Sequence, residues 1–189
     1  MTNGVFSDFE LDQMGLKFKD GETYESVNCV GSCEEEMESK TITKSCRGVV
    51  VKSVARGTGA GTLKISAHIP YAVYIKAYGM ELGTLIKGVK AYGRNSTHAA
   101  FGIVMHIKDE DGVEKFKAYP NCVMSSGVSR KIENGAEEVA ELEIEISVMP
   151  DEYGNGMYEA IADELDDESV KTTWMTAFTP ELVQTVTSA

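Results

Sequence analysis

Three glutamates alternate along one segment near the end of the chain, and paired carboxylates are the groups that cleave glycosidic bonds. Glu141, Glu143 and Glu145 share one side of this segment, at roughly 6.6–7 Å intervals if it is a strand. A glycosidase normally takes its two carboxylates from different strands around a cleft. The spacing therefore favours a solvated strand face over a catalytic pair.

Three further motifs have the residue types of functional loops but not their spacing. The run GTGAG at 57–61 lacks both the Lys-Ser/Thr of a phosphate loop and the spacing of a dinucleotide site, and it predicts a hairpin loop. The run DEDG at 109–112 has its glycine too early for a calcium loop and predicts a turn. Ser125-Ser126-Gly127 lacks the frame of a nucleophile elbow. We therefore expect no catalytic residue, no cofactor and no enzymatic activity.

The cysteines and histidines do not form a metal-binding pattern. Cys29 and Cys33 are separated by three residues, but no second pair follows at the spacing of a zinc finger. We expect all four cysteines, which include Cys46 and Cys122, to be reduced and free of metal. His68 and His106 are predicted on the wet faces of their strands.

The net charge of −12 is concentrated in the last third of the chain. Residues 133–189 carry 15 acidic side chains and one lysine, whereas residues 1–132 carry a net charge of +2. Such an acidic surface repels phosphates and argues against tight DNA binding; an acidic face that aids solubility is the other interpretation. No signal peptide and no membrane-spanning apolar run is visible, so we expect synthesis in a cytosol and no membrane anchor.

Alternation of apolar and polar residues predicts a mainly β protein. The clearest strands are 62–69, 101–108 and 141–149, each with one buried and one wet face. Less regular strand candidates are 15–19, 23–30, 36–46, 48–55, 85–91 and 114–129. Turn signals at Asp111-Gly112 and Asn134-Gly135 connect neighbouring strands. The pattern predicts a mostly antiparallel β-sandwich or barrel.

Two helices and two terminal arms complete the predicted organisation. Pro70 starts a helix that continues to residue 79, and a second helix is predicted over 157–165. Residues 1–12 and 168–189 are predicted as an N-terminal and a C-terminal arm around a β domain of residues 13–167. Their apolar anchors are too widely spaced for a self-sufficient element, so we expect both arms to be mobile until assembly. These anchors are Phe6, Phe9, Leu11, Trp174, Phe178 and Leu182.

Several stretches resemble the major tail proteins, or tail tube proteins, of siphophages and prophages of Gram-positive bacteria. The likeness is carried by MTNGVFSDFELDQMGLKFKDGETYESVNCVGSCEEEMESKTITKSCRG, GTLKISAHIPYAVYIKAYGM, KAYPNCVMSSGVSRKIENGAEEVAELEIEISVMPDEYGNGMYEA and WMTAFTPELVQ. It covers nearly the whole chain; the segment after Val183 is only weakly patterned. The resemblance implies the tail-tube fold, in which two antiparallel sheets pack together with a flanking α-helix. This fold is similar to the tube rings of type VI secretion.

The resemblance also implies a structural role in the virion tail. Six copies would form a ring, and rings would stack into a tube around a tape-measure protein, with a tail terminator protein at its end and DNA passing through the lumen. We expect Glu141, Glu143 and Glu145 to line this lumen, where an acidic wall lets DNA slide. Two alternatives stay open: another phage morphogenesis component, such as a tail terminator or capsid decoration protein, or a small β-rich hydrolase that uses Glu141 and Glu143.

Overall fold

A computed structural model describes residues 6–27, 29–132, 134–135 and 140–185. The strands are β1 (Glu10–Phe18), β2 (Glu25–Val27), β3 (Val30–Cys46), β4 (Val49–Ala67), β5 (Phe101–Lys108), β6 (Glu114–Met124), β7 (Leu142–Val148) and β8 (Tyr158–Ile161). The helices are α1 (Tyr71–Ala77) and α2 (Glu168–Ala177), with short 3-10 turns η1 (Ala162–Glu164) and η2 (Pro180–Val183). The predicted mainly β, antiparallel fold is confirmed.

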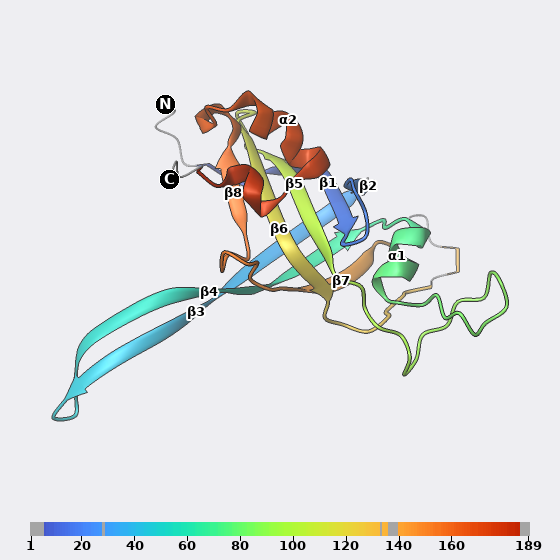
Figure 1. Cartoon of the computed structure of the whole chain (residues 1–189), viewed down its shortest axis with the longest axis horizontal. Coiled ribbons are helices and arrows are strands. Elements are labelled where there is room, and N and C mark those ends of the chain that lie inside the picture. The colour runs from blue at the N-terminus through green and yellow to red at the C-terminus, as the bar shows by residue number, and fades with distance from the viewer. Residues whose placement is uncertain (1–5, 28, 133, 136–139, 186–189) are drawn as a thin grey trace.

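All eight strands belong to one sheet rather than two. Its order is β2-β1-β5-β6-β7-β4-β3, and β8 pairs with the first part of β6. The sheet is curled, as shown by β1 and β3, which are far apart in this order and yet line the same cleft. Figure 1 shows the sheet strongly twisted, with α1 at one end and α2 against the β5–β6 side.

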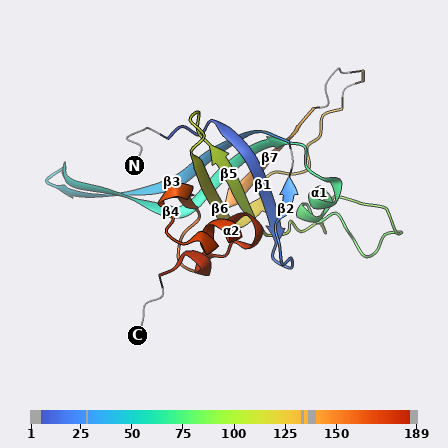
Figure 2. The ribbon, with the colours of Figure 1, turned by 90° about the horizontal axis from the view of Figure 1, so that it is seen from above.

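Apolar side chains fill both sides of the central strands. The main core lies inside the curled sheet, where Leu63, Ile103 and Ile146 are almost fully buried. A second core lies on the opposite face of β5 and β6, where α2 packs Trp174 and Phe178 against Val104 and Phe116. Figure 2 shows α2 across this face of the sheet.

β7 follows the predicted alternation. Ile144, Ile146 and Val148 are buried, while Glu143 and Glu145 are exposed. The sheet partner β4 shows the same pattern, with Leu63, Ile65 and Ala67 buried. These three apolar side chains therefore belong to the main core, as predicted, whereas Leu142, which was predicted to be buried with them, is half-buried at its edge.

Ile144→Ala should lower the free energy of unfolding by about 2–5 kcal/mol, because it removes a packed side chain that is 5% exposed. Glu143→Ala on the opposite face of the same strand is the matched control and should change stability by less than about 0.5 kcal/mol. Urea denaturation of both variants measures the difference. Equal midpoints for the two would contradict the assignment of the core face.

β3 and β4 form a long hairpin that extends well beyond the rest of the sheet (Figure 1). The chain reverses at Arg47 and Gly48, whose φ values of 51° and 81° are those of a two-residue hairpin turn. We call residues 38–57 the projecting hairpin. Every residue in it is exposed except Val54, which is half-buried. The projecting hairpin therefore has solvent on both faces.

The predicted loop at 57–61 is wrong, because these residues lie inside β4. Gly61 pairs with Met37 and Gly57 pairs with Ser39, so three residues bulge out opposite Glu38. Gly59 takes the positive φ of 75° that this bulge requires. Three glycines in five residues are typical of a loop, but here they permit a bulge within a continuous strand.

Three other predicted elements differ from the structure. Residues 157–165 form β8 and η1 rather than a helix, since Tyr158–Ile161 pairs with β6. Residues 85–91 form turns rather than a strand, and β6 ends at Met124 rather than 129. The turns at 111–112 and 134–135 and the helix after Pro70 are confirmed.

Residues 168–189 were expected to form an arm outside the core, but α2, which lies within them, packs into the second core. Trp174 and Phe178 are each 1% exposed and belong to the second core. At the other end, Leu11 pairs within the sheet and Phe6 packs against the main core, whereas Phe9 is 72% exposed. Residues 1–5 and 186–189 lie outside the described residues; the domain boundaries and the mobility of the arms stay predictions.

Candidate functional site

The predicted glutamates belong to an acidic face on the outer side of β3, β4 and β7. Glu143 and Glu145 point away from the core and stand opposite Ser66 and Lys64 of β4. On the other side of β4, Glu34 of β3 also stands opposite Lys64. One lysine thus lies between two carboxylates, which leaves the face with excess negative charge.

Glu34 and Glu36 extend this face beyond the residues that the sequence singled out. Both are exposed and alternate with Glu35, whose side chain points toward the inside of the sheet. The run of three glutamates at 34–36 conceals this alternation in the sequence. We define the acidic face by Glu34, Glu36, Glu141, Glu143 and Glu145. A groove of about 440 Å³ runs along it, lined in part by Glu34, Lys64, Glu143 and Glu145.

Glu141 lies along the sheet rather than projecting from it. Its carboxylate accepts a hydrogen bond of 2.6 Å from the Ser66 hydroxyl. The same carboxylate lies against Gly31, where any side chain would collide with it. Glu143 and Glu145 are therefore the residues of the predicted set that are free to meet a molecule passing over this face.

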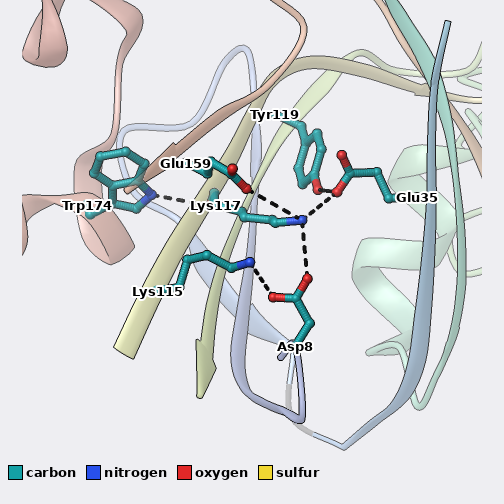
Figure 3. Close-up of polar contacts among 7 residues, drawn as sticks. All are labelled: Asp8, Glu35, Lys115, Lys117, Tyr119, Glu159 and Trp174. Atoms are coloured by element: carbon teal, nitrogen blue, oxygen red, sulfur yellow. Dashed lines mark hydrogen bonds and ion pairs between the residues drawn. The ribbon is translucent and has the colours of Figure 1, made fainter. Parts of the chain in front are cut away.

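A second polar cluster lies inside the curled sheet around Lys117 (Figure 3). The Lys117 ammonium donates a hydrogen bond of 2.7 Å to Glu35, and the Tyr119 hydroxyl donates one of 2.7 Å to the same carboxylate oxygen. Asp8 and Glu159 each place a carboxylate oxygen 3.9 Å from the ammonium. Lys115 pairs with Asp8. The cluster joins the segment before β1 to β3, β6 and β8.

The carboxylates of this cluster stabilise the charged form of Lys117. Burial alone would lower the pKa of Lys117, but the hydrogen bond and charge of Glu35, with Asp8 and Glu159, outweigh it and raise that pKa. Burial raises the pKa of Tyr119 well above its usual range, and the nearby Glu35 carboxylate adds to this. Lys117 stays charged and Tyr119 stays neutral at physiological pH, so both groups act as fixed hydrogen-bond donors.

The cluster borders a cleft of about 610 Å³ between β1 and β3. Apolar side chains of Phe9, Leu11 and Ile107 line it together with Glu35 and Lys117. The polar groups at its inner end are bonded to one another, so the arrangement fastens β3 to β6.

His106 is not a surface residue, as the sequence had suggested. It is 9% exposed, it lies 3.0 Å from Asp12 through Nδ1, and its ring stacks on Phe116. α2 covers the face of β5 that was predicted to be wet. His68 is exposed, as predicted.

The DEDG run at 109–112 forms a turn, as the sequence predicted. The Asp109 carboxylate accepts hydrogen bonds from the backbone of Asp111 and Val113 and so closes the turn between β5 and β6.

The four cysteines are free thiols, and burial raises the pKa of Cys33 to about 11. In the described part of the chain, no three His, Cys, Asp or Glu side chains are grouped so that they could hold a metal ion. None of the helices described there has the length and apolar character needed to cross a bilayer.

Comparisons with known proteins reveal a structural likeness but no match in sequence. No protein-family model matches the chain, and no curated protein sequence matches it. The cryo-EM structure of the anti-feeding prophage cap, a tube terminating cap, aligns with a TM-score of 0.48 at 12% sequence identity. The alignment covers 86% of this chain and 98% of the cap protein.

Proposed function

We propose that this chain is the structural protomer of a non-contractile phage tail tube, which forms stacked hexameric rings that conduct DNA during ejection. Its partners in this proposal are other copies of itself, the tape-measure protein and the tail terminator protein, and its location is the virion tail. The proposal assigns no enzymatic activity to the chain. It rests on the sequence resemblance together with one structural feature, the unfinished edge of the sheet.

That feature is β3, a 17-residue strand at the edge of the sheet. One side of β3 pairs with β4, and no strand of the described part of the chain pairs with its other side. Long exposed edges promote pairing with other chains, and a lone two-stranded ribbon is at best marginally stable in water. A ring of copies would cover this edge, because each subunit could present a strand to its neighbour.

Electron microscopy of concentrated protein tests the proposal. Stacked tubes are the expected result. Isolated single rings would instead favour a tail terminator, and monomers at every concentration would contradict a self-assembling protomer. A capsid decoration protein would form neither tubes nor rings by itself but would bind preformed capsids.

In this proposal the acidic face lines the tube lumen. Glu143 and Glu145 are exposed on the wet side of β7, and repulsion between such a wall and the phosphates would keep DNA from adhering. Glu141 contributes charge to the same wall although it lies flat on the sheet.

Glu143→Lys combined with Glu145→Lys should therefore leave the subunit folded but slow DNA ejection. The slowing should be most severe at low salt, where screening is weak. Asp163→Lys with Glu164→Lys is the matched control, because these two acids are exposed on η1, outside the acidic face. Ejection kinetics measured on particles that contain the variant tube provide the test. Normal kinetics at low salt for the β7 variant would place this face outside the lumen.

A further inference from the structure

The long loop that joins α1 to β5 places several large apolar side chains in solvent. Ile86 is 82% exposed and Val89 is 52% exposed, and Leu85 and Tyr92 are exposed beside them. Every residue from 83 to 89 is exposed. We call residues 82–94 the loop tip. Neighbouring apolar side chains that are left in water in this way mark an interaction site.

Two consecutive tight turns give the loop tip its shape. The backbone N–H of Leu85 donates a hydrogen bond to the carbonyl of Leu82, and that of Val89 donates one to the carbonyl of Ile86. Gly88, in the third position of the second turn, takes the positive φ of 93° that suits a glycine there. Ile86 and Val89 therefore lie at the two ends of one turn, on a loop that extends from the body of the molecule (Figure 1).

The base of this loop is fastened to α1 and β6. The backbone N–H of Ala99 donates a hydrogen bond to the carbonyl of Ala77, the last residue of α1. The His98 ring lies 2.7 Å from the carbonyl oxygen of Met124 through Nδ1 and 3.1 Å from the Tyr92 hydroxyl through Nε2. The loop is thus held at its base while its tip lies in solvent.

The charged side chains of the loop tip are all basic. Residues 82–94 contain Lys87, Lys90 and Arg94 and no acidic residue, in a chain whose net charge is −12. Lys90 pairs with Glu81 at the base. Among the described residues, Lys87 and Arg94 have no ion-pair partner. The loop tip therefore combines exposed apolar side chains with free cations, and this combination suits a partner that is both anionic and apolar.

We infer that the loop tip binds the surface of an anionic lipid bilayer. Ile86 and Val89 enter the boundary between headgroups and acyl chains, and Lys87 and Arg94 lie at the anionic headgroups, which is how interfacial segments bind membranes. Such binding is peripheral and needs no membrane-spanning segment. Nucleic acid phosphates offer nothing to the apolar side chains, and a protein partner would need a pocket shaped to this projecting turn.

The acidic strands of the chain do not prevent this contact. The loop tip extends from the body (Figure 1), so its cations reach a bilayer before the acidic strands do. At physiological salt, repulsion between charges more than about 8 Å apart is largely screened.

The projecting hairpin also has apolar side chains beside cations, but its geometry suits a bilayer less well. Val49, Val50 and Val51 follow one another in β4, so successive side chains point to opposite sides of the ribbon. Ile86 and Val89, in contrast, are brought together by one turn. The hairpin therefore supplies a matched control for the loop tip.

Vesicle binding by the full-length chain tests this inference. In cosedimentation at low salt, the chain should bind vesicles of phosphatidylglycerol at least tenfold more tightly than vesicles of phosphatidylcholine. Ile86→Ser combined with Val89→Ser should weaken binding to the anionic vesicles at least tenfold, because it removes the apolar side chains that enter the bilayer.

Lys87→Gln combined with Arg94→Gln should weaken the same binding roughly 25-fold, since each basic side chain near an anionic surface contributes about a factor of five. This loss should shrink at high salt, where charges are screened. Val49→Ser with Val50→Ser in the projecting hairpin is the control. Both valines are more than half exposed, and this variant should bind vesicles as the wild type does.

Each other outcome overturns the inference in a recognisable way. An equal loss in the control variant would assign the binding to the projecting hairpin. A loss in the Lys87 and Arg94 variant without one in the Ile86 and Val89 variant would indicate adsorption by charge alone. A wild-type chain that ignores both kinds of vesicle, while Ile86→Ser with Val89→Ser abolishes its self-association, would show that the loop tip meets another copy of the chain.

The inference does not depend on the proposed tube, and the two can fail separately. Tubes that form normally from the Ile86 and Val89 variant, together with lost vesicle binding, would support the inference and leave the tube proposal intact. Vesicle binding by a wild-type chain that stays monomeric at every concentration would support the inference and contradict the tube.

Discussion

Lys117→Met is expected to lower the free energy of unfolding by about 3–5 kcal/mol, the usual effect of removing one partner from a buried ion pair. Lys117 is 9% exposed, and its ammonium is the cation closest to the Glu35 carboxylate. Methionine keeps most of the side-chain volume but removes the Lys117 charge, so that the Tyr119 hydroxyl is the remaining donor to Glu35 among the described residues. Chemical denaturation of the variant measures the loss.

Glu35→Gln in the Lys117→Met background supplies the control. The glutamine carbonyl can still accept the Tyr119 hydrogen bond, and no charge is left without a partner. The double variant should therefore recover much of the loss, and a double-mutant cycle should show strong coupling between the two positions. If the two single losses simply add, the ion pair does not hold β3 to β6.

The pH dependence of this effect has a definite sign. The pKa of Lys117 is raised in the folded protein, so its contribution to stability is complete below the ordinary lysine value of about 10.4 and is lost as pH rises through the folded value. The stability difference between wild type and Lys117→Met should stay constant from about pH 7 to 9. It should narrow only in strong alkali.

Sequence patterning predicts the parts of this fold whose environment is set by one strand and its turn. β7 alternates because one of its faces meets the core and the other meets water. The turn at 111–112 can be predicted because Asp109 and Gly112 satisfy its local geometry by themselves. Neither feature depends on a residue far away in the chain.

The predictions from sequence fail where a segment distant in the chain determines the surroundings of a residue. β5 alternates in the sequence, yet both of its faces are buried. The second face is covered by α2, which lies more than sixty residues further along the chain. This burial takes His106 out of solvent. The strand bulges at 57–61 where the loop around Gly154 and Gly156 packs against Gly59, and the sequence around the bulge does not reveal this contact.

The two polar sites differ in the same way. Glu143 and Glu145 can be placed on a wet face from their own strand alone. The Lys117 cluster joins residues 82 positions apart, and nothing near Glu35 distinguishes it from Glu34 and Glu36. In the projecting hairpin, Lys40 pairs with Arg56 and Lys44 pairs with Lys52. These pairs follow only from the strand register, which cannot be derived when 57–61 is predicted as a loop.

Trp174→Ala is expected to lower the free energy of unfolding by about 3–5 kcal/mol, because it empties the centre of the second core. The Trp174 ring is 1% exposed and lies 4.7 Å from the Phe178 ring and 5.9 Å from the Phe116 ring, centroid to centroid. Its indole nitrogen donates a hydrogen bond of 3.2 Å to the carbonyl of Lys117. This one side chain thus joins α2 to the strand that carries the buried lysine.

Trp174→Phe separates packing from the hydrogen bond, since it keeps an aromatic ring and should cost markedly less than Trp174→Ala. As the chain contains a single tryptophan, wild-type fluorescence also reports directly on this position. In an isolated subunit the emission should be that of a buried indole, and it should shift to longer wavelength when the chain unfolds. An emission maximum typical of solvent-exposed tryptophan in a folded monomer, with Trp174→Ala leaving stability unchanged, would show that α2 leaves the sheet until assembly, as expected of a mobile C-terminal arm.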